Sequence, residues 1–146
     1  MDTIALRFGE HFAPACGTIA AHEELIKTYG YVWYGKMGAP LSDKIIKMIC
    51  ESSEKRILLI QSGKTGRYWA YVEEVSRKLP PLEQIPSYYR SNASKFGCWF
   101  KVSRFEEAPK NIMSFCRVKS SRTPLNLVSK HCLNPYFIIE VSDKEY

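Results

Sequence analysis

The sequence predicts an α+β fold in which a small, strongly bent β-barrel of mixed or antiparallel strands carries about two or three short peripheral helices. Three observations support this prediction. About five to seven short segments are rich in β-branched and aromatic residues, as strands are. The helical segments do not alternate regularly with these strands, as they would in a doubly wound parallel sheet. A Gly-Lys-Thr-Gly turn at residues 63–66 joins two strand-like runs and is typical of a hairpin.

The composition fits a single domain over residues 1–146. The chain is 45% hydrophobic and 25% charged, which is usual for a globular protein with its own core. It has no apolar run as long as a membrane span and no signal-peptide pattern, so we expect a cytoplasmic protein without a membrane partner. The five cysteines are scattered without C-x-x-C spacing, which favours free thiols. The net charge of +6 favours a polyanionic partner.

Residues 1–30 are expected to form an N-terminal extension that packs on the rest of the domain. Residues 3–8 suit an opening strand or an extended arm, and the stretch after them is irregular. Apolar residues recur at helical spacing over residues 18–29, which predicts a helix there. Thr18 would cap the N-terminus of this helix, and Gly30 would cap its C-terminus.

The stretch YVWYGK at residues 31–36 has the composition of a strand. Because side chains alternate along a strand, Trp33 would lie on one face and Tyr34 on the other. A second helix is predicted to open at residue 41 or 42, after a proline, and to end near residue 51. Asp43 would lie in its first turn, where the helix dipole favours a carboxylate.

Residues 56–62, RILLIQS, form an almost continuous apolar run and therefore predict a central strand. Residues 67–77 return after the turn as its antiparallel partner. Alternation along the returning strand places Arg67, Trp69 and Tyr71 on one face, which mixes charge with large aromatic rings. We interpret this face as a half-open ligand surface, and we expect the opposite face of the strand to lie against the core.

Residues 79–95 contain three prolines, two adjacent tyrosines and a Ser-Asn-Ala-Ser stretch, which indicates a long excursion over the surface. Long ordered loops of this kind are often functional. The remaining predicted elements are a strand at residues 98–105, a short strand at 115–119, a helix beginning at Pro124 and a closing strand at 136–141. No internal repeat and no linker composition divides the chain.

The Gly-Lys-Thr sequence within residues 63–66 is similar to the end of a phosphate-binding loop. A P-loop also needs an earlier glycine about five residues before the Gly-Lys pair and a helix after it, and this chain has neither. We therefore exclude a P-loop. The backbone N–H groups of the turn, together with Lys64, are still suited to a more modest phosphate contact.

No metal-ligand set and no catalytic group is expected. His11, Cys16 and His22 match no common zinc spacing. His22 lies on the apolar face of its predicted helix, where a structural role or a place in a pocket fits better than metal binding. His131 and Cys132 show no spacing typical of a base and a nucleophile. We therefore expect no catalytic residue, no metal site and no cofactor.

Aromatic residues, which make up 13% of the chain, are the strongest functional signal. Nucleobase sites stack the base on aromatic faces and use nearby lysine or arginine for phosphates. The candidate base-binding residues are Trp33, Tyr34, Ser62, Trp69, Tyr71 and Trp99, with Ser62 as the polar reader of the base edge. The candidate phosphate-binding residues are Lys36, Lys64 and Arg67. Each tryptophan taken alone also fits a core position, so the interpretation depends on the set.

Several motifs resemble the PUA-like superfamily and, within it, the EVE and ASCH domains. The aromatic strand YVWYGK is followed by a short helix, an apolar strand ending in serine (ILLIQS) and its partner RYWAYVEEV. A later tryptophan strand (CWFKV) and a Pro-Leu helix (TPLNLVSKH) are also similar, so the resemblance covers about residues 31–141. It implies a bent β-barrel with a pocket for a modified nucleobase, often a flipped methylated one. Such domains serve RNA modification or defence against foreign DNA.

The leading hypothesis is therefore a binding module rather than an enzyme: a PUA-like domain that recognises a modified or extruded base in RNA or DNA. One alternative is a small, metal-independent ribonuclease or hydrolase of the ASCH type, which would use Lys64, Arg67 and Tyr68. A second alternative is a protein-interaction or regulatory module in which the basic charge has no role.

Overall fold

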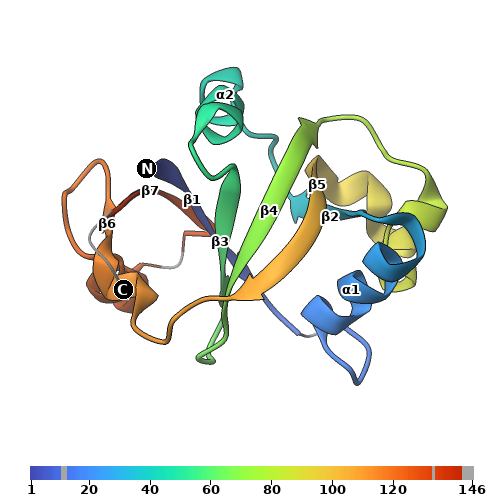
Figure 1. Ribbon diagram of the computed structural model, residues 1–146, viewed down its shortest axis with the longest axis horizontal. Helices are drawn as coiled ribbons and strands as arrows, with labels where there is room; N and C mark the ends of the chain where they lie inside the picture. Colours follow the sequence, from blue (N-terminus) through green and yellow to red (C-terminus); the bar gives the residue numbers. More distant parts are fainter. Residues whose placement is uncertain (11–12, 133, 143–146) are drawn as a thin grey trace.

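The computed structural model describes residues 1–10, 13–132 and 134–142. Within these residues, seven strands form one mixed sheet with the order β2-β5-β4-β3-β1-β7-β6 (Figure 1). The strands are β1 (Asp2–Phe8), β2 (Val32–Met37), β3 (Arg56–Gln61), β4 (Arg67–Ser76), β5 (Phe96–Glu107), β6 (Cys116–Val118) and β7 (Tyr136–Val141). The helices are α1 (Thr18–Tyr29), α2 (Asp43–Glu51) and α3 (Leu125–His131), with the 3₁₀-helices η1 (Leu82–Gln84), η2 (Ser87–Lys95) and η3 (Ile112–Phe115).

The sheet is open and strongly bent, with β2 at one edge and β6 at the other. Neighbouring strands are antiparallel except β1 and β3, which pair in parallel. The register between β4 and β5 shifts after Tyr71 and again after Val72. Such bulges bend a strand and increase its twist, and Figure 1 shows the curvature of β5. The predicted α+β class with a bent, mixed sheet is confirmed, in an open form.

The hairpin predicted at the middle of the sequence is present. β3 and β4 pair antiparallel, with Ile57 opposite Ala70 and Leu59 opposite Tyr68. β3 is also the middle strand of the sheet, and residues 57–60 are all buried. The apolar run is therefore covered on both faces, as a central strand requires.

Residues 1–30, expected to pack on the rest of the domain as an N-terminal extension, supply one strand of the sheet and one helix that covers it. β1 lies inside the sheet, between β3 and β7, and its residues Ile4 and Ala5 are completely buried. α1 packs against β2 and β5, on a different part of the sheet (Figure 1). The parallel pairing of β1 with β3 needs a long connection, here containing α1, β2 and α2, so no local pattern in the sequence reveals it.

The helices lie close to their predicted positions. Gly30 adopts the left-handed conformation after α1, with a φ of 83°, and its N–H donates to the Ile26 carbonyl at 2.8 Å. The N-cap of α1 is Gly17 rather than Thr18. A carboxylate caps this end instead, because Glu10 Oε2 accepts a hydrogen bond from the Thr18 N–H at 2.9 Å. None of the helices in the described part of the chain is long and apolar enough to cross a membrane.

The buried side chains of the described residues fall into three clusters, because both faces of the sheet are covered. The first cluster lies under α1 and α2 and includes Val32 and Phe100. The second lies on the opposite face under α3 and η3 and includes Trp69. The third lies beside η1 and η2 and includes Trp33 and Trp99. The face of β4 that we interpreted as a half-open ligand surface is therefore closed at Trp69.

Candidate functional site

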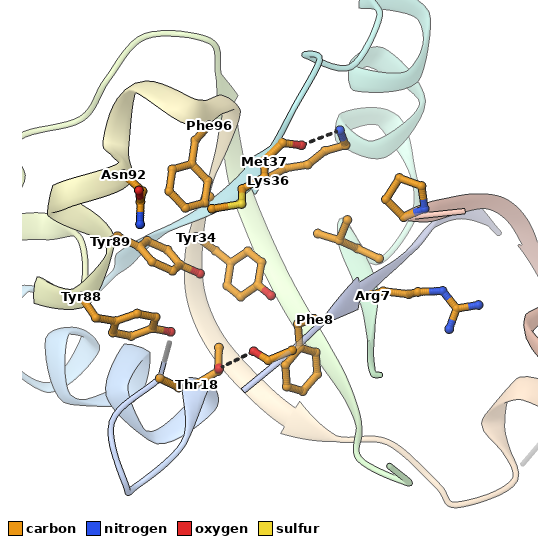
Figure 2. Close-up of a pocket in the computed structure, with 15 residues that line it drawn as sticks. Arg7, Phe8, Thr18, Tyr34, Lys36, Met37, Tyr88, Tyr89, Asn92 and Phe96 are labelled. Carbon is orange, nitrogen blue, oxygen red and sulfur yellow. Dashed lines mark hydrogen bonds between the residues drawn. The ribbon is translucent and has the colours of Figure 1, made fainter. Parts of the chain in front are cut away.

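A cavity of about 280 Å³ lies between β1, β2 and η2 (Figure 2). Five of the fifteen residues that line it are aromatic, namely Phe8, Tyr34, Tyr88, Tyr89 and Phe96. The polar side chains that line it are Arg7, Thr18, Lys36 and Asn92. We name this cavity the aromatic pocket. Ligand sites are typically apolar clefts of about 300–1,000 Å³ with a few polar groups, so this pocket suits a small, flat ligand.

A glycine in β2 allows the aromatic wall to form. A Cβ atom added to Gly35 would lie 2.5 Å from Phe96 Cδ1 and 2.8 Å from Trp99 Cζ3. These separations are too short for any real side chain, so the two rings pack against the strand because residue 35 has none. The glycine in the YVWYGK stretch therefore positions Phe96 at the pocket.

The rings of the wall support one another. The ring centroid of Tyr89 lies 4.7 Å from that of Phe96, 4.8 Å from that of Tyr88 and 6.5 Å from that of Tyr34. The ring plane of Tyr89 meets those of Tyr88 and Tyr34 at 66° and 81°. Edge-to-face pairs of this kind contribute about 0.5–1.5 kcal/mol each beyond burial. The wall is therefore organised without a ligand.

The tyrosine hydroxyls of the pocket stay protonated. Burial raises the pKa of Tyr34 and of Tyr89 well above the ordinary value for tyrosine, and it also raises the pKa of Tyr88. The nearby Glu10 carboxylate acts in the same direction on all three pKa values. At neutral pH the pocket therefore presents hydroxyl donors and no tyrosinate.

Lys36 lines the pocket, but its ammonium group is held by the protein. Nζ donates to the Ala39 carbonyl at 2.8 Å and to the Met37 carbonyl at 3.3 Å, the latter drawn in Figure 2. Nζ also lies 5.2 Å from the centre of the Tyr136 ring. The residue is only 6% exposed. Lys36 thus fixes the turn after β2 and the ring of Tyr136 at the edge of the pocket.

Arg7 joins the pocket to the C-terminal part of the fold. Its Nη2 donates to the Ser129 carbonyl at 2.8 Å and to the Cys132 carbonyl at 2.6 Å. Its Nε donates to the Asn134 carbonyl at 3.0 Å, and the guanidinium lies 5.5 Å from the centre of the Phe137 ring. Both cations of the pocket are therefore tied to protein groups and add positive potential without a mobile side chain.

His22 lies beside the aromatic wall. Its ring centroid is 4.8 Å from that of Tyr34, and Nδ1 donates to the Thr18 carbonyl at 2.8 Å. Nε2 is buried and has no hydrogen-bond partner among the described residues. Burial lowers the pKa of His22 to about 4, although the hydrogen bond to Thr18 acts in the opposite direction. His22 is therefore neutral near pH 7 and packs against Tyr34 as an uncharged ring.

The metal set considered from the sequence cannot be assembled from the described residues. They contain no group of three or more His, Cys, Asp or Glu side chains that could hold a metal ion. His11 lies outside the described residues, Cys16 is exposed and His22 is buried. The cysteines of the described chain are all free thiols.

The three tryptophans do not lie together in one cluster. Trp33 and Trp99 belong to the cluster beside η1 and η2, whereas Trp69 belongs to the cluster on the opposite face of the sheet. Their exposed fractions are 8%, 1% and 1%, in the order Trp33, Trp99 and Trp69. None of them lines the aromatic pocket. Each tryptophan is buried in a core cluster, because packed elements cover both faces of the sheet. A role of the tryptophans in base binding stays a prediction.

The other predicted site residues are divided among three places. Tyr34 and Lys36 line the aromatic pocket. Ser62, Lys64 and Arg67 lie at or beside the turn between β3 and β4, and Tyr71 lies on the same face of β4 as Trp69. These four residues do not line the pocket. The structure therefore assembles the candidate site mainly from side chains outside the predicted set.

Sequence reasoning missed most of the pocket wall. Tyr88, Tyr89 and Asn92 lie on η2, within the excursion over residues 79–95 that we singled out as functional. The adjacent tyrosines of that excursion are the signal that points to them. The sequence does not show that η2 folds back onto β5, which is what brings Tyr89 next to Phe96.

The fold and the pocket define a small α+β domain with an open, bent sheet and an aromatic side pocket suited to a flat ligand. A family model described as Pua-like matches residues 4–137. The chain therefore belongs to the Pua-like family, as its motifs predicted. Searches of curated proteins and of solved structures returned no match. Domains of this family typically bind RNA or other nucleic acids; the narrower EVE or ASCH assignment stays a prediction.

Proposed function

We propose that the protein binds nucleic acid and holds one nucleobase, modified or flipped out of its helix, in the aromatic pocket. The observation that carries this proposal is the arrangement of Tyr34, Tyr89 and Phe96 around a cavity of about 280 Å³. Flipping a base costs a few kcal/mol, and stacking on an aromatic side chain returns about 1–3 kcal/mol. The stacking free energy is therefore similar in size to the cost of flipping, so an aromatic wall that is already in place determines whether binding is favourable.

The charge of the wall favours a nucleobase over a cationic ligand. Aromatic cages also bind quaternary ammonium groups, but Arg7 and Lys36 line this cavity and none of the described residues that line it is Asp or Glu. The nearby Glu10 carboxylate is already engaged as the acceptor of the Thr18 N–H. The protonated tyrosine hydroxyls can donate to ring nitrogens or carbonyl oxygens of a base. Asn92 adds an amide, which can donate and accept at the edge of a base.

The apolar part of the wall supports a modified base as the ligand. Leu6, Phe8 and Met37 line the cavity together with the tyrosines. A methyl group on the base would bury its surface against these side chains, which is worth about 0.8 kcal/mol for each buried methylene-sized group. An unmodified base would lack this contribution, so the pocket would bind the modified form more tightly.

The geometry does not favour the metal-independent hydrolase. Arg67 and Tyr68 are neighbours in β4 and point to opposite faces of the sheet. Arg67 Nε donates to Met113 Sδ at 2.7 Å, whereas the Tyr68 ring packs against Phe8 at a centroid distance of 6.2 Å. Lys64 is exposed at the turn before them. Side chains that act together in catalysis must reach one reacting atom, and these three do not converge.

Calorimetric titration with methylated, hydroxymethylated and unmodified nucleosides of adenine and cytosine tests the proposal. We expect Tyr89→Ala to weaken binding of the preferred nucleoside by about 1–3 kcal/mol because a stacking face is lost. Tyr89→Phe keeps the ring and should retain most of the affinity. Tyr29→Ala is the matched control, since Tyr29 is exposed on α1 and does not line the pocket.

Thermal melts of the same variants show whether each protein remains folded. The proposal is wrong if neither nucleosides nor single-stranded oligonucleotides bind at low salt. It is also wrong if Tyr89→Ala is folded and binds with unchanged affinity, and that result would direct attention to a protein partner.

A further inference from the structure

A second cavity, of about 750 Å³, lies between α2 and β7. α2 packs against β1, the neighbour of β7 in the sheet (Figure 1). Its apolar surface includes Ile45 and Met48 from α2 and Tyr136 and Ile138 from β7. All four are half-buried and pack on the first hydrophobic cluster. We name this cavity the α2–β7 groove.

The groove and the aromatic pocket adjoin each other. Pro135 lines both cavities. Lys36 lines the pocket, and its Nζ lies 5.2 Å from the ring centre of Tyr136, which lines the groove. A ligand chain that leaves the pocket over Pro135 therefore enters the groove next to the Tyr136 ring.

The rim of the groove is basic and polar. Lys44 is exposed in the first turn of α2 and has no ion-pair partner among the described residues. Lys119 lies on the opposite side, where it forms an ion pair with Asp2, which also lines the groove and offsets the charge of Lys119. Ser120 and Asn134 add groups that both donate and accept hydrogen bonds. The groove thus combines an aromatic ring, an unpaired cation and polar side chains around an apolar surface.

From this arrangement we infer that the α2–β7 groove binds the single-stranded nucleotides that flank the base held in the aromatic pocket. The inference rests on the proposed function of that pocket. Tyr136 offers a stacking surface for a neighbouring base, and Lys44 contacts a backbone phosphate. Lys36 is a positioning residue, because its buried ammonium holds the Tyr136 ring and does not itself reach the phosphate.

Nucleic acid fits the groove better than an acidic peptide does. Sites for single strands combine stacking rings with cations that follow the backbone, and both are present here. The groove, at about 750 Å³, is larger than the 280 Å³ pocket, so it has room for more than a single base. An acidic peptide would contact the lysines of the groove. It has no flat ring to place in the adjoining aromatic pocket, whereas a nucleic acid strand does.

The test compares oligonucleotides with nucleosides on the same variants. Fluorescence anisotropy measures binding of labelled single-stranded DNA and RNA of mixed sequence and about twelve nucleotides. We expect Lys44→Glu to weaken this binding about tenfold and to lower the salt slope by about one phosphate contact. Lys47→Glu is the matched control, because Lys47 is an exposed lysine of the same helix that does not line the groove. Tyr136→Ala should cost about tenfold, whereas Tyr136→Phe should keep the affinity.

Each other outcome has a definite meaning. The inference is overturned if Lys44→Glu and Lys47→Glu have equal effects, since only the general charge would then matter. It is also overturned if nucleoside binding falls as much as oligonucleotide binding, if poly-glutamate competes as well as the oligonucleotide does, or if no oligonucleotide binds at low salt. If oligonucleotide binding depends on Lys44 and Tyr136 but not on Tyr89, the groove is supported and the proposed function of the aromatic pocket fails.

Discussion

Three polar residues at the aromatic wall, His22, Tyr34 and Tyr89, are uncharged at neutral pH, unlike Arg7 and Lys36. His22, Tyr34 and Tyr89 lie in contact with one another, and burial is the main cause of the pKa shift of each. For the histidine, burial favours the neutral ring; for the tyrosines, it favours the protonated hydroxyl. The protonation states of these three side chains therefore do not change around neutral pH. Low pH can disturb the pocket, because protonation of His22 would place a positive charge in the buried interior, away from water.

Lowering the pH should destabilise the protein through His22. Its pKa is about 4 in the folded protein, against 6.5 for an exposed histidine. Between these values the unfolded chain binds a proton that the folded protein does not, so stability falls as the pH decreases from about 6.5 to about 4. The loss should reach about 3 kcal/mol at the acidic end and be absent above pH 7.

Urea unfolding of the wild type and of His22→Gln at several pH values measures this loss. Glutamine does not titrate, so the difference between the two pH curves isolates His22 from the acidic residues of the chain. Two parallel curves would mean that the histidine is protonated equally well in the folded and unfolded states.

Among the elements, β4 shows what a pattern in the sequence can predict. Alternation predicts the face of the strand on which a side chain lies, but it does not predict what covers that face. Its alternation correctly separates Ala70 and Val72, in the first cluster, from Trp69, in the second. The cover over Trp69 comes from η3 and α3, which follow much later in the chain. An aromatic residue on a strand therefore cannot be assigned to a pocket or to a core until its distant cover is known.

Replacing Trp69 should affect stability and leave the pocket intact. Trp69 is 1% exposed, and the Arg56 guanidinium lies 4.0 Å from its ring centre. We expect Trp69→Ala to lower the free energy of unfolding by about 3–5 kcal/mol, as large-to-small changes in a core do. Trp69→Phe should lose less. Urea unfolding measures the stability, and calorimetry below the melting temperature measures nucleoside binding. A folded Trp69→Ala protein with lost nucleoside affinity would instead place Trp69 in the binding site.

The same contrast explains which elements the sequence predicts. The β3–β4 hairpin and α1 follow from local signals, namely the turn at residues 63–66 and the capping glycine Gly30. The position of β1 and the placement of η2 depend on contacts between distant segments. Tyr34 and Lys36 were therefore predicted at the site from their own strand, whereas Tyr88 and Tyr89 required the folded chain.

At the scale of the whole molecule, the net charge of +6 should govern how strongly nucleic acid is held. The cations inside the aromatic pocket are occupied by carbonyl groups, so phosphate contacts must come from exposed lysines and arginines. Each phosphate neutralised on a single strand contributes about −0.7 to the slope of log K against log salt.

We expect affinity for single-stranded oligonucleotides to fall with salt at a slope of about −2 to −3, which corresponds to roughly three or four phosphates. Anisotropy titrations across a salt series measure the slope, and the free nucleoside, which has no phosphate, serves as the control. An oligonucleotide affinity that does not change with salt would remove the nucleic-acid backbone as a partner.

The site also has a consequence for the order in which the protein is made. Phe8 and Pro135 are far apart in the sequence but line the same pocket, and β1 has β7 as one of its two neighbours. On the ribosome, β1 emerges before β7, so this edge of β1 stays unpaired until all the intervening residues have been made. A translation product that stops before β7 would keep an open strand edge, which templates aggregation. The aromatic pocket can therefore be complete only after Pro135 and β7 have been synthesised.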